Sequence, residues 1–274
     1  MSKIRIVQLS DPHFDTVIEK IQNALVKSVQ DLSPNLIVMT GDITQRAQDS
    51  EFKEAVRFKQ SLGPYLFMAI PGNHDIPLYN LFARAFSPYG GYLKLFSHKL
   101  NEHWSSSDIE VGLLNSTSRF RLVQGALHPA LIASTFKNPI TQSSVRILGF
   151  HHPMDCAKHV DDQNLLKNRD EVMEACTNAR VDLILGGHIH DPYTALSMGR
   201  YPSQPRPMII TVAGTSLSWR TRANAPNSFH QIDIESGLTP EITITRHDLN
   251  HEFEFKFKEQ SRFRRSENKG WLSV

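Results

Sequence analysis

The chain has little of what marks several large protein classes. It holds only two cysteines among 274 residues, Cys156 and Cys176, which excludes a disulfide-rich secreted scaffold and a CxxC metal or redox pair. Lys and Arg number 30 against 28 Asp and Glu, so no charge excess favours a nucleic-acid polymer as partner. No apolar run approaches the roughly 20 residues that span a bilayer. Residues 1–3 lead directly into the apolar run 4–9 without room for a signal peptide, so we expect a cytoplasmic protein with no membrane span.

Apolar residues, by contrast, are plentiful. Hydrophobic residues make up 40% of the chain and charged residues 21%, which is typical of a globular protein with a substantial core. No linker or internal repeat divides the sequence, so we expect a single domain over residues 1–274, with a β-rich carboxyl-terminal part from about residue 208. The 13 histidines are the unusual feature, and their positions carry most of the information about function.

Five short β-branched runs are predicted strands, and each one ends in residues that commonly bind metals. The runs are 4–9, 36–39, 65–70, 145–150 and 181–185. The residues that follow them are, in order, Asp11-Pro12-His13, Gly41-Asp42, Gly72-Asn73-His74-Asp75, His151-His152-Pro153 and Gly187-His188-Ile189-His190. Because ligands in open α/β sheets bind at the carboxyl ends of the strands, this pattern predicts one shared site.

Two predicted helices separate the first three predicted strands. Apolar residues recur at helical spacing in 16–32 and 48–62, and the order β-α-β-α-β predicts a layered α/β fold. Further helices are expected at 128–136 and 168–180, and further strands at 110–115, 208–213, 229–234, 241–246 and 252–258. In the last of these strands Phe253, Phe255 and Phe257 alternate with charged residues, which predicts one buried and one exposed face.

The residue types at the strand ends favour a site for two transition-metal ions. In an extended segment residues i and i+2 point the same way, so Asp11 and His13 can hold one ion together, and His188 and His190 can form a pair or serve two ions. Asp42 can bridge two cations with its two carboxylate oxygens. Nitrogen and oxygen donors without thiolate suit Zn, Mn, Fe or Co, and the set is too large for one tetrahedral zinc. Two ions about 3.5–4 Å apart would use the whole set and would activate a bridging hydroxide for phosphoester hydrolysis.

Together, the five blocks resemble the signature of calcineurin-like metallophosphoesterases, in the order of that family and over roughly two-thirds of the chain. The resemblance implies a two-sheet α/β/β/α sandwich with two divalent ions, Mn, Fe or Zn, at one rim. It implies one ion held by Asp11, His13, Asp42 and His190, and a second held by Asp42, Asn73, His151 and His188. The His-x-Pro spacing of the family selects His151 as the ligand, which leaves His152 to pack or to form a hydrogen bond behind the ligands.

The resemblance also assigns roles on the substrate side of the site. His74 is expected to touch the phosphate or to protonate the leaving oxygen, Asp75 to orient His74, and Asn73 to contact the substrate as well as a metal. Arg46 lies where related Ser/Thr phosphatases carry a phosphate-binding arginine. Because this chain has Gln45 where those enzymes have Asp, an exposed position at a helix start is an equal alternative for Arg46.

Two further arginines, Arg220 and Arg222, could line the substrate cleft, although an exposed loop is the preferred interpretation of both. The remaining histidines outside the five blocks fit no ligand spacing, and we expect them to be structural.

We therefore expect a dinuclear metal-dependent phosphodiesterase acting on a small phosphoester, with a 3′,5′-cyclic nucleotide as one candidate. The chain looks most like the bacterial class III cyclic-nucleotide phosphodiesterase and glycerophosphodiesterase group, and His74 stands where nucleotide-sugar lipid hydrolases typically carry Arg. The alternatives are a phosphomonoesterase or nucleotide-pyrophosphate hydrolase of the same superfamily, and a non-catalytic binding module. The sequence is compatible with a monomer and with a homodimer.

Overall fold

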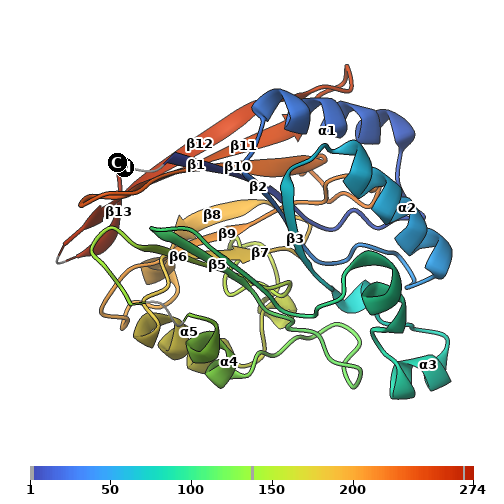
Figure 1. The fold of residues 1–274 in the computed structure, drawn as a ribbon, viewed down its shortest axis with the longest axis horizontal. Coiled ribbons are helices and arrows are strands. Elements are labelled where there is room, and N and C mark those ends of the chain that lie inside the picture. The colour runs from blue at the N-terminus through green and yellow to red at the C-terminus, as the bar shows by residue number, and fades with distance from the viewer. Residues whose placement is uncertain (1–2, 137–138, 268) are drawn as a thin grey trace.

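Two mixed β-sheets pack face to face, and helices cover the outer side of each sheet (Figure 1). The computed structural model describes residues 3–136, 139–267 and 269–274. The strand order is β13-β12-β11-β10-β1-β2-β3 in the first sheet and β4-β5-β6-β7-β9-β8 in the second. The predicted α/β/β/α sandwich is confirmed.

The first sheet joins a parallel half to an antiparallel half. Its parallel strands are β1 (Lys3–Leu9), β2 (Leu36–Thr40) and β3 (Leu66–Ile70). The strands β10 (Ser228–Glu235), β11 (Glu241–Leu249), β12 (Phe255–Ser266) and β13 (Gly270–Ser273) continue from β1 in antiparallel pairs. The sequence predicted the β-rich carboxyl-terminal part but not β13.

The second sheet has a parallel centre and antiparallel edges. The centre consists of β5 (Ile109–Leu113), β6 (Val145–Gly149), β7 (Leu183–Gly186) and β9 (Ile209–Val212). The edges are β4 (Glu102–Ser105) and β8 (Tyr193–Leu196), neither of which the sequence predicted.

The helices lie in two outer layers. Figure 1 shows α1 (Glu19–Leu32) and α2 (Asp49–Ser61) over the first sheet, and α4 (Pro129–Thr135) and α5 (Arg169–Asn178) beneath the second. These four helices match the predicted ranges to within about three residues, as expected for helix ends. The short α3 (Leu81–Phe86) and a π-helical turn at Tyr92–Phe96 were not predicted.

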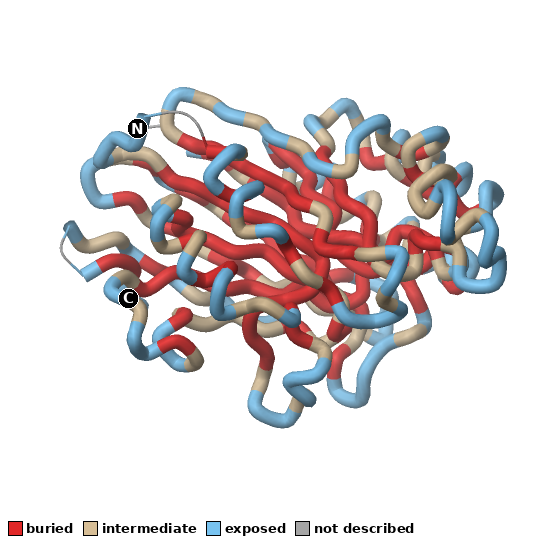
Figure 2. Tube along the Cα trace, turned by 90° about the horizontal axis from the view of Figure 1, so that it is seen from below, coloured by how far each residue is buried: buried red, intermediate tan, exposed pale blue. Residues whose placement is uncertain are grey.

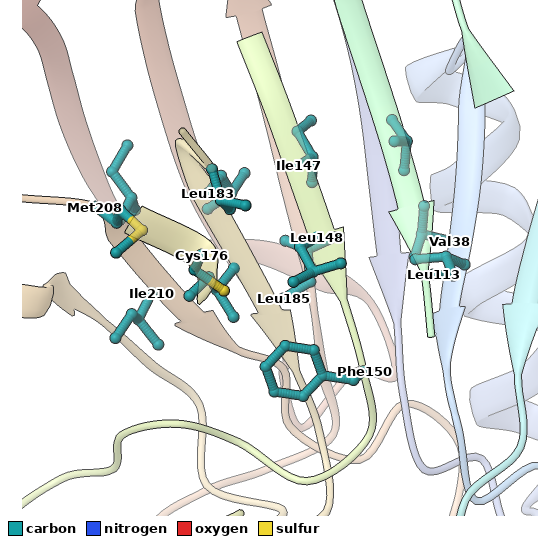
Figure 3. Packing of buried hydrophobic residues seen from close by; sticks show 14 of the residues in the cluster. Val38, Leu113, Ile147, Leu148, Phe150, Cys176, Leu183, Leu185, Met208 and Ile210 are labelled. Atoms are coloured by element: carbon teal, nitrogen blue, oxygen red, sulfur yellow. The ribbon is translucent and has the colours of Figure 1, made fainter. Parts of the chain in front are cut away.

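Strand periodicity explains how one chain builds both interior layers. Along β1, Ile6 joins the cluster between the two sheets, whereas Val7 and Leu9 join the cluster under α1 and α2. The cluster between the sheets brings Val38 of β2 together with Leu113 of β5 and other residues shown in Figure 3. The central strands of both sheets are accordingly buried along most of their length, whereas β4, β8 and most of β12 are not. The exposed segments lie mainly at the periphery (Figure 2).

The predicted alternation of Phe253, Phe255 and Phe257 is wrong in part. Phe255 is 7% exposed and packs against Phe229, but Phe257 is 64% exposed and Phe253 lies in the turn before β12. The pairing of β11 with β12 shifts beside Phe257, because Lys258 is an extra residue opposite the step from Arg246 to His247. Such a bulge bends the strand and redirects its side chains.

No helix among the described residues combines the length and the apolar character needed to cross a bilayer. Both cysteines, Cys156 and Cys176, are buried free thiols.

Candidate functional site

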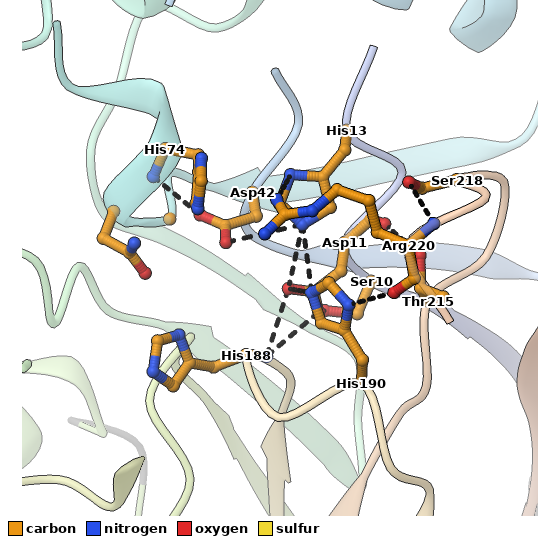
Figure 4. A network of polar contacts seen from close by, with 12 residues as sticks. Ser10, Asp11, His13, Asp42, His74, His188, His190, Thr215, Ser218 and Arg220 are labelled. Atoms are coloured by element: carbon orange, nitrogen blue, oxygen red, sulfur yellow. Dashed lines mark hydrogen bonds and ion pairs between the residues drawn. The ribbon is translucent and has the colours of Figure 1, made fainter. Parts of the chain in front are cut away.

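The loops that follow β1, β2 and β7 bring four metal-binding side chains together (Figure 4). Asp11, His13, Asp42 and His190 are all buried, and one ligand atom from each lies within 4.8 Å of the others. Nε2 of His190 is 3.2 Å from Oδ1 of Asp11 and 3.0 Å from Nε2 of His13. The sequence predicted these four residues as one group, and the structure brings them together.

Three histidines form a second group next to the first. His151, His152 and His188 each place a ring nitrogen within 4.8 Å of the others. Nε2 of His151 is also 3.3 Å from Oδ1 of Asp42 and 3.2 Å from Oδ1 of Asn73. The predicted second ligand set therefore converges as well, with His152 as an additional neighbour.

Asp42 lies between the two groups. Its Oδ1 faces His151, while its Oδ2 is 3.7 Å from Nε2 of His13 in the first group. A carboxylate with one oxygen toward each group has the arrangement that a bridging ligand requires.

The hydrogen bonds of His152 and His188 separate their roles. His152 uses both ring nitrogens on protein groups, Nδ1 with Oγ of Ser116 at 2.8 Å and Nε2 with the carbonyl of Val123 at 2.8 Å. Neither ring nitrogen of the buried His188 has a hydrogen-bond partner within the described residues. Because a buried polar atom without a partner is unfavourable, His188 is the side chain that most clearly points to a bound metal ion.

Carbonyl groups fix the orientation of two other histidines. Nδ1 of His151 lies 2.8 Å from the carbonyl of Thr40, and Nδ1 of His190 lies 2.8 Å from the carbonyl of Arg220. A neutral imidazole that donates from Nδ1 to a carbonyl keeps its lone pair on Nε2, which is the atom that faces the cluster in both cases.

The backbone of the site is strained at the cluster residues themselves. Five of them have positive φ angles, namely Asp11 (49°), His13 (47°), Asp42 (47°), His188 (72°) and His190 (62°). This left-handed region is uncommon for residues with a side chain, and it clusters at functional sites. A glycine is needed at position 72 for a different reason, since a Cβ there would lie 2.1 Å from Oδ1 of Asp42.

Burial and mutual charge set the protonation of the cluster. Burial would raise the pKa of Asp11, but His190 and His151 beside it lower that pKa to about 2. Burial likewise opposes ionisation of Asp42, yet neighbouring His151 and His74 hold its pKa well below the usual range. Two anionic carboxylates therefore persist at neutral pH in a buried place.

The histidines divide into neutral and protonated members. Burial lowers the pKa of His13 to about 3, and burial together with nearby His151 lowers that of His188 to about 4. Burial also acts on His151, but Asp42 and Asp11 outweigh it and raise its pKa to about 9. His13 and His188 are thus in the neutral form that binds metals, and a cation bound by His151 must displace its proton.

These observations fit metal ions as the missing partners. The donors are carboxylates, imidazoles and one amide oxygen, a set that suits Zn, Mn or Fe. The two buried anions and the unpartnered nitrogens of His188 both favour a cation in the site.

His74 lies at the edge of the first group, as expected, but it has another partner than predicted. Its ring packs edge-on against His13 with 4.8 Å between the ring centroids, and its Nδ1 is 2.9 Å from the carbonyl of Gln45. The sequence suggested Asp75 as the group that orients His74. The Asp75 carboxylate instead accepts hydrogen bonds from the backbone N–H groups of Ile43, Thr44 and Gly72 and from the Thr44 hydroxyl.

Asp75 therefore ties the loop after β3 to the loop after β2. Burial and the charge of Asp42 raise the pKa of Asp75 to about 6. Its bonds hold in place the segment that carries Asp42, which is a structural role and not the orienting role predicted for it.

The structure agrees with the exposed alternative for Arg46 and differs from the exposed loop expected for Arg220. Arg46 is exposed and lines a surface pocket with Pro77 and Leu78, and no described contact joins its side chain to the cluster. Arg220, expected on an exposed loop, is half-buried and donates from Nη1 to Oε1 of Gln45 at 2.8 Å. Its position after the Gly214-Thr215 strand end was the only signal in the sequence.

Comparison with known proteins identifies relatives of this arrangement. The family model for calcineurin-like phosphoesterases matches residues 4–192. A protein named as a probable cyclic nucleotide phosphodiesterase in Coxiella burnetii is 28% identical over 207 residues, covering 70% of this chain and 77% of that protein.

Solved structures share the fold at low sequence identity. A purple acid phosphatase from yellow lupin (Lupinus luteus) seeds superposes with a TM-score of 0.64 at 12% identity, over 94% of this chain but only 53% of the lupin chain. A dimetal phosphatase from Danio rerio gives a TM-score of 0.61 at 11% identity, over 99% of this chain and 98% of the other.

Proposed function

We propose a function on the premise that this chain belongs to the calcineurin-like phosphoesterase family, whose model matches well over half of its length. The family match and the relative named as a phosphodiesterase make this protein a metal-dependent phosphoester hydrolase. Within that class we assign it to the hydrolysis of a small phosphodiester, with a 3′,5′-cyclic nucleotide as the leading candidate. The relative in Coxiella burnetii supports this choice of substrate.

The observation that carries the proposal is the position of Asp42 between two donor groups. We assign one divalent ion to Asp11, His13, Asp42 and His190, whose ligand atoms converge within 4.8 Å. We assign a second ion to Asp42, Asn73, His151 and His188, since Nε2 of His151 approaches both Asp42 and Asn73 and His188 lacks other partners. When bound, such a pair of ions supplies an acidified water as nucleophile and offsets the charge that develops on the phosphoryl oxygens.

His74 has the properties of the proton donor in this proposal. Its Nδ1 is engaged by the Gln45 carbonyl, so Nε2 is the nitrogen left for the substrate. When the ring carries a proton on Nε2 as well, it can give that proton to the leaving oxygen and take another from water afterwards. A positioned proton donor matters most for a poor leaving group such as a ribose alkoxide.

A substrate panel with metal-stripped protein tests the proposal. Mn²⁺ is added back, and cyclic nucleotides, glycerophosphodiesters, nucleotide polyphosphates, a phosphomonoester and a chromogenic diester are compared, with Asp42→Ala as the matched control. We expect two ions per chain in the wild type and Mn²⁺-dependent turnover that is highest on cyclic nucleotides. A clear preference for the monoester would contradict the diester assignment, and two bound ions without turnover of any substrate would indicate a binding module.

A further inference from the structure

The loop after β9 is fixed against the segment that carries the first metal-binding residues. The hydroxyl of Thr215 donates to the carbonyl of Asp11 at 2.6 Å, and the hydroxyls of Ser218 and Thr16 lie 2.6 Å apart. Oγ of Ser218 also accepts from the backbone N–H of Arg220 at 3.0 Å. Arg220 therefore starts from an anchored backbone, and Figure 4 shows its side chain reaching over the cluster.

The guanidinium of Arg220 is held by neutral groups. Its Nη1 donates to Oε1 of Gln45 at 2.8 Å and lies 3.4 Å from Nδ1 of His13. Within the part of the chain that the structure describes, no carboxylate pairs with this guanidinium, and its Nε and Nη2 have no hydrogen-bond partner. A half-buried guanidinium with a full positive charge and unused donors is a site for an oxyanion.

The two other arginines considered from the sequence lack these features. Arg46 is exposed and turned toward the pocket beside Pro77. Arg222 is exposed, and its Nε donates to the carbonyl of Ile189 at 3.1 Å. Both therefore serve as matched controls, because each removes one exposed arginine whose side chain has no described contact with Gln45 or His13.

We propose that Arg220 is a substrate-binding residue that donates hydrogen bonds to a non-bridging phosphoryl oxygen, on the side of the site formed by Asp11, His13, Asp42 and His190. This inference rests on the proposed phosphoester hydrolysis for the identity of the anion. A guanidinium suits this task because its planar array of donors matches the spacing of phosphate oxygens.

Gln45 is the positioning residue for both groups on the substrate side. Its backbone carbonyl faces Nδ1 of His74 at 2.9 Å, while its side-chain oxygen accepts from Arg220 at 2.8 Å. Because the side-chain amide is neutral, it orients the guanidinium without cancelling its charge. Replacement of the Gln45 side chain changes the support of Arg220 and leaves the carbonyl that serves His74.

Binding of inorganic phosphate to Mn²⁺-loaded protein, measured by calorimetry, tests Arg220 independently of turnover. Removal of a charge-assisted hydrogen bond predicts that Arg220→Ala weakens phosphate binding by about 10- to 100-fold, with Arg220→Lys in between. Arg222→Ala and Arg46→Ala should bind phosphate as the wild type does. Arg220→Ala should keep its metal content, because the carbonyl that holds His190 belongs to the backbone.

Two variants of Gln45 distinguish loss of its hydrogen bond to Arg220 from addition of a negative charge beside the guanidinium. Gln45→Ala removes the tether and is expected to raise KM more than it lowers kcat on a diester. Gln45→Glu keeps a tether but pairs the guanidinium with an anion, so it should weaken phosphate binding more than Gln45→Ala does. A residue with a merely structural role would not respond to this difference in charge.

Two results would overturn the inference. One is equal phosphate affinity in Arg220→Ala and Arg222→Ala, and the other is loss of metal from Arg220→Ala, which would mean that it acts through the ligands. Failure of the proposed function looks different, since the wild type would then bind phosphate through Arg220 but hydrolyse no phosphoester.

Discussion

His151 and His152 are adjacent and buried, yet the structure predicts opposite consequences when each is replaced by Ala. His152 gives both ring nitrogens to Ser116 and Val123. Its loss leaves a cavity and takes a partner from the buried Ser116 hydroxyl and from the Val123 carbonyl, which should lower the free energy of unfolding by about 3–5 kcal/mol. His151 gives one nitrogen to Thr40, and its other nitrogen faces Asp42 and Asn73. Replacement of His151 by Ala should remove one of the side chains that bind a metal ion.

Unfolding free energy alone does not distinguish the two variants, because His151→Ala also unpairs the buried Asp42. The distinguishing quantity is the increase in unfolding free energy on adding Mn²⁺. An ion at 100 times its dissociation constant adds about 2.7 kcal/mol. His152→Ala should start from a lower unfolding free energy but gain as much from Mn²⁺ as the wild type does. His151→Ala should lose the part of the Mn²⁺-dependent increase in unfolding free energy that comes from one ion.

The assay is urea unfolding with and without Mn²⁺, combined with elemental analysis of ions per chain. If His152→Ala proves too unstable to purify, His152→Asn retains a polar side chain and serves in its place. The reasoning is refuted if a His152 variant loses the Mn²⁺ increment while His151→Ala keeps it, since the ligand would then be one residue further along the chain.

Three further outcomes are expected. Asp42→Ala should lose one or both ions and nearly all activity, because its two oxygens face the two donor groups; two retained ions by elemental analysis would contradict the bridging assignment. His74→Ala should keep both ions but lose about 100-fold or more in kcat on an alkyl diester and distinctly less on a nitrophenyl diester, and equal losses on both would exclude a proton-donor role. Burial lowers the pKa of His230 to about 3, below its unfolded value, so its contribution to stability is lost as pH falls below about 6.5. His230→Asn should therefore reduce the loss of unfolding free energy between pH 7.5 and pH 5 by about 2 kcal/mol in urea titrations, and an unchanged difference would show that His230 is not buried as a neutral ring.

The parts of the fold that the sequence predicted are those with local signals. The parallel strands are short β-branched runs, and helices α1 and α2 carry regular apolar stripes. The edge strand β8 lacks such a signal, because all four of its residues are only partly buried. β13 was missed because it is a run of four residues without a β-branched side chain and with only two of them buried.

The site divides in the same way. Residues at strand ends, such as Asp11 and His188, were predictable because parallel strands deliver their carboxyl ends to one rim. The position of Arg220 depends on contacts with Gln45 and Thr16 that lie about 175 and 200 residues away in the chain, and no local pattern reports them. The role of Asp75 was mispredicted for the same reason, since three of its four hydrogen bonds come from Ile43 and Thr44 in the loop after β2.

At each cluster residue with a left-handed backbone conformation, the residue that favours stability differs from the residue that binds the metal. Asp11, His13, Asp42, His188 and His190 occupy conformations that glycine adopts without steric strain, each at about 1–2 kcal/mol for a residue with a Cβ. Glycine at any of these positions would relax the chain and delete a ligand in the same step. A variant library selected for thermal stability in a chelating buffer should therefore accumulate glycine at these positions. The selected proteins should keep the fold but lose metal binding and activity. The same library sorted with Mn²⁺ present should retain the original residues, because bound cations reverse the balance.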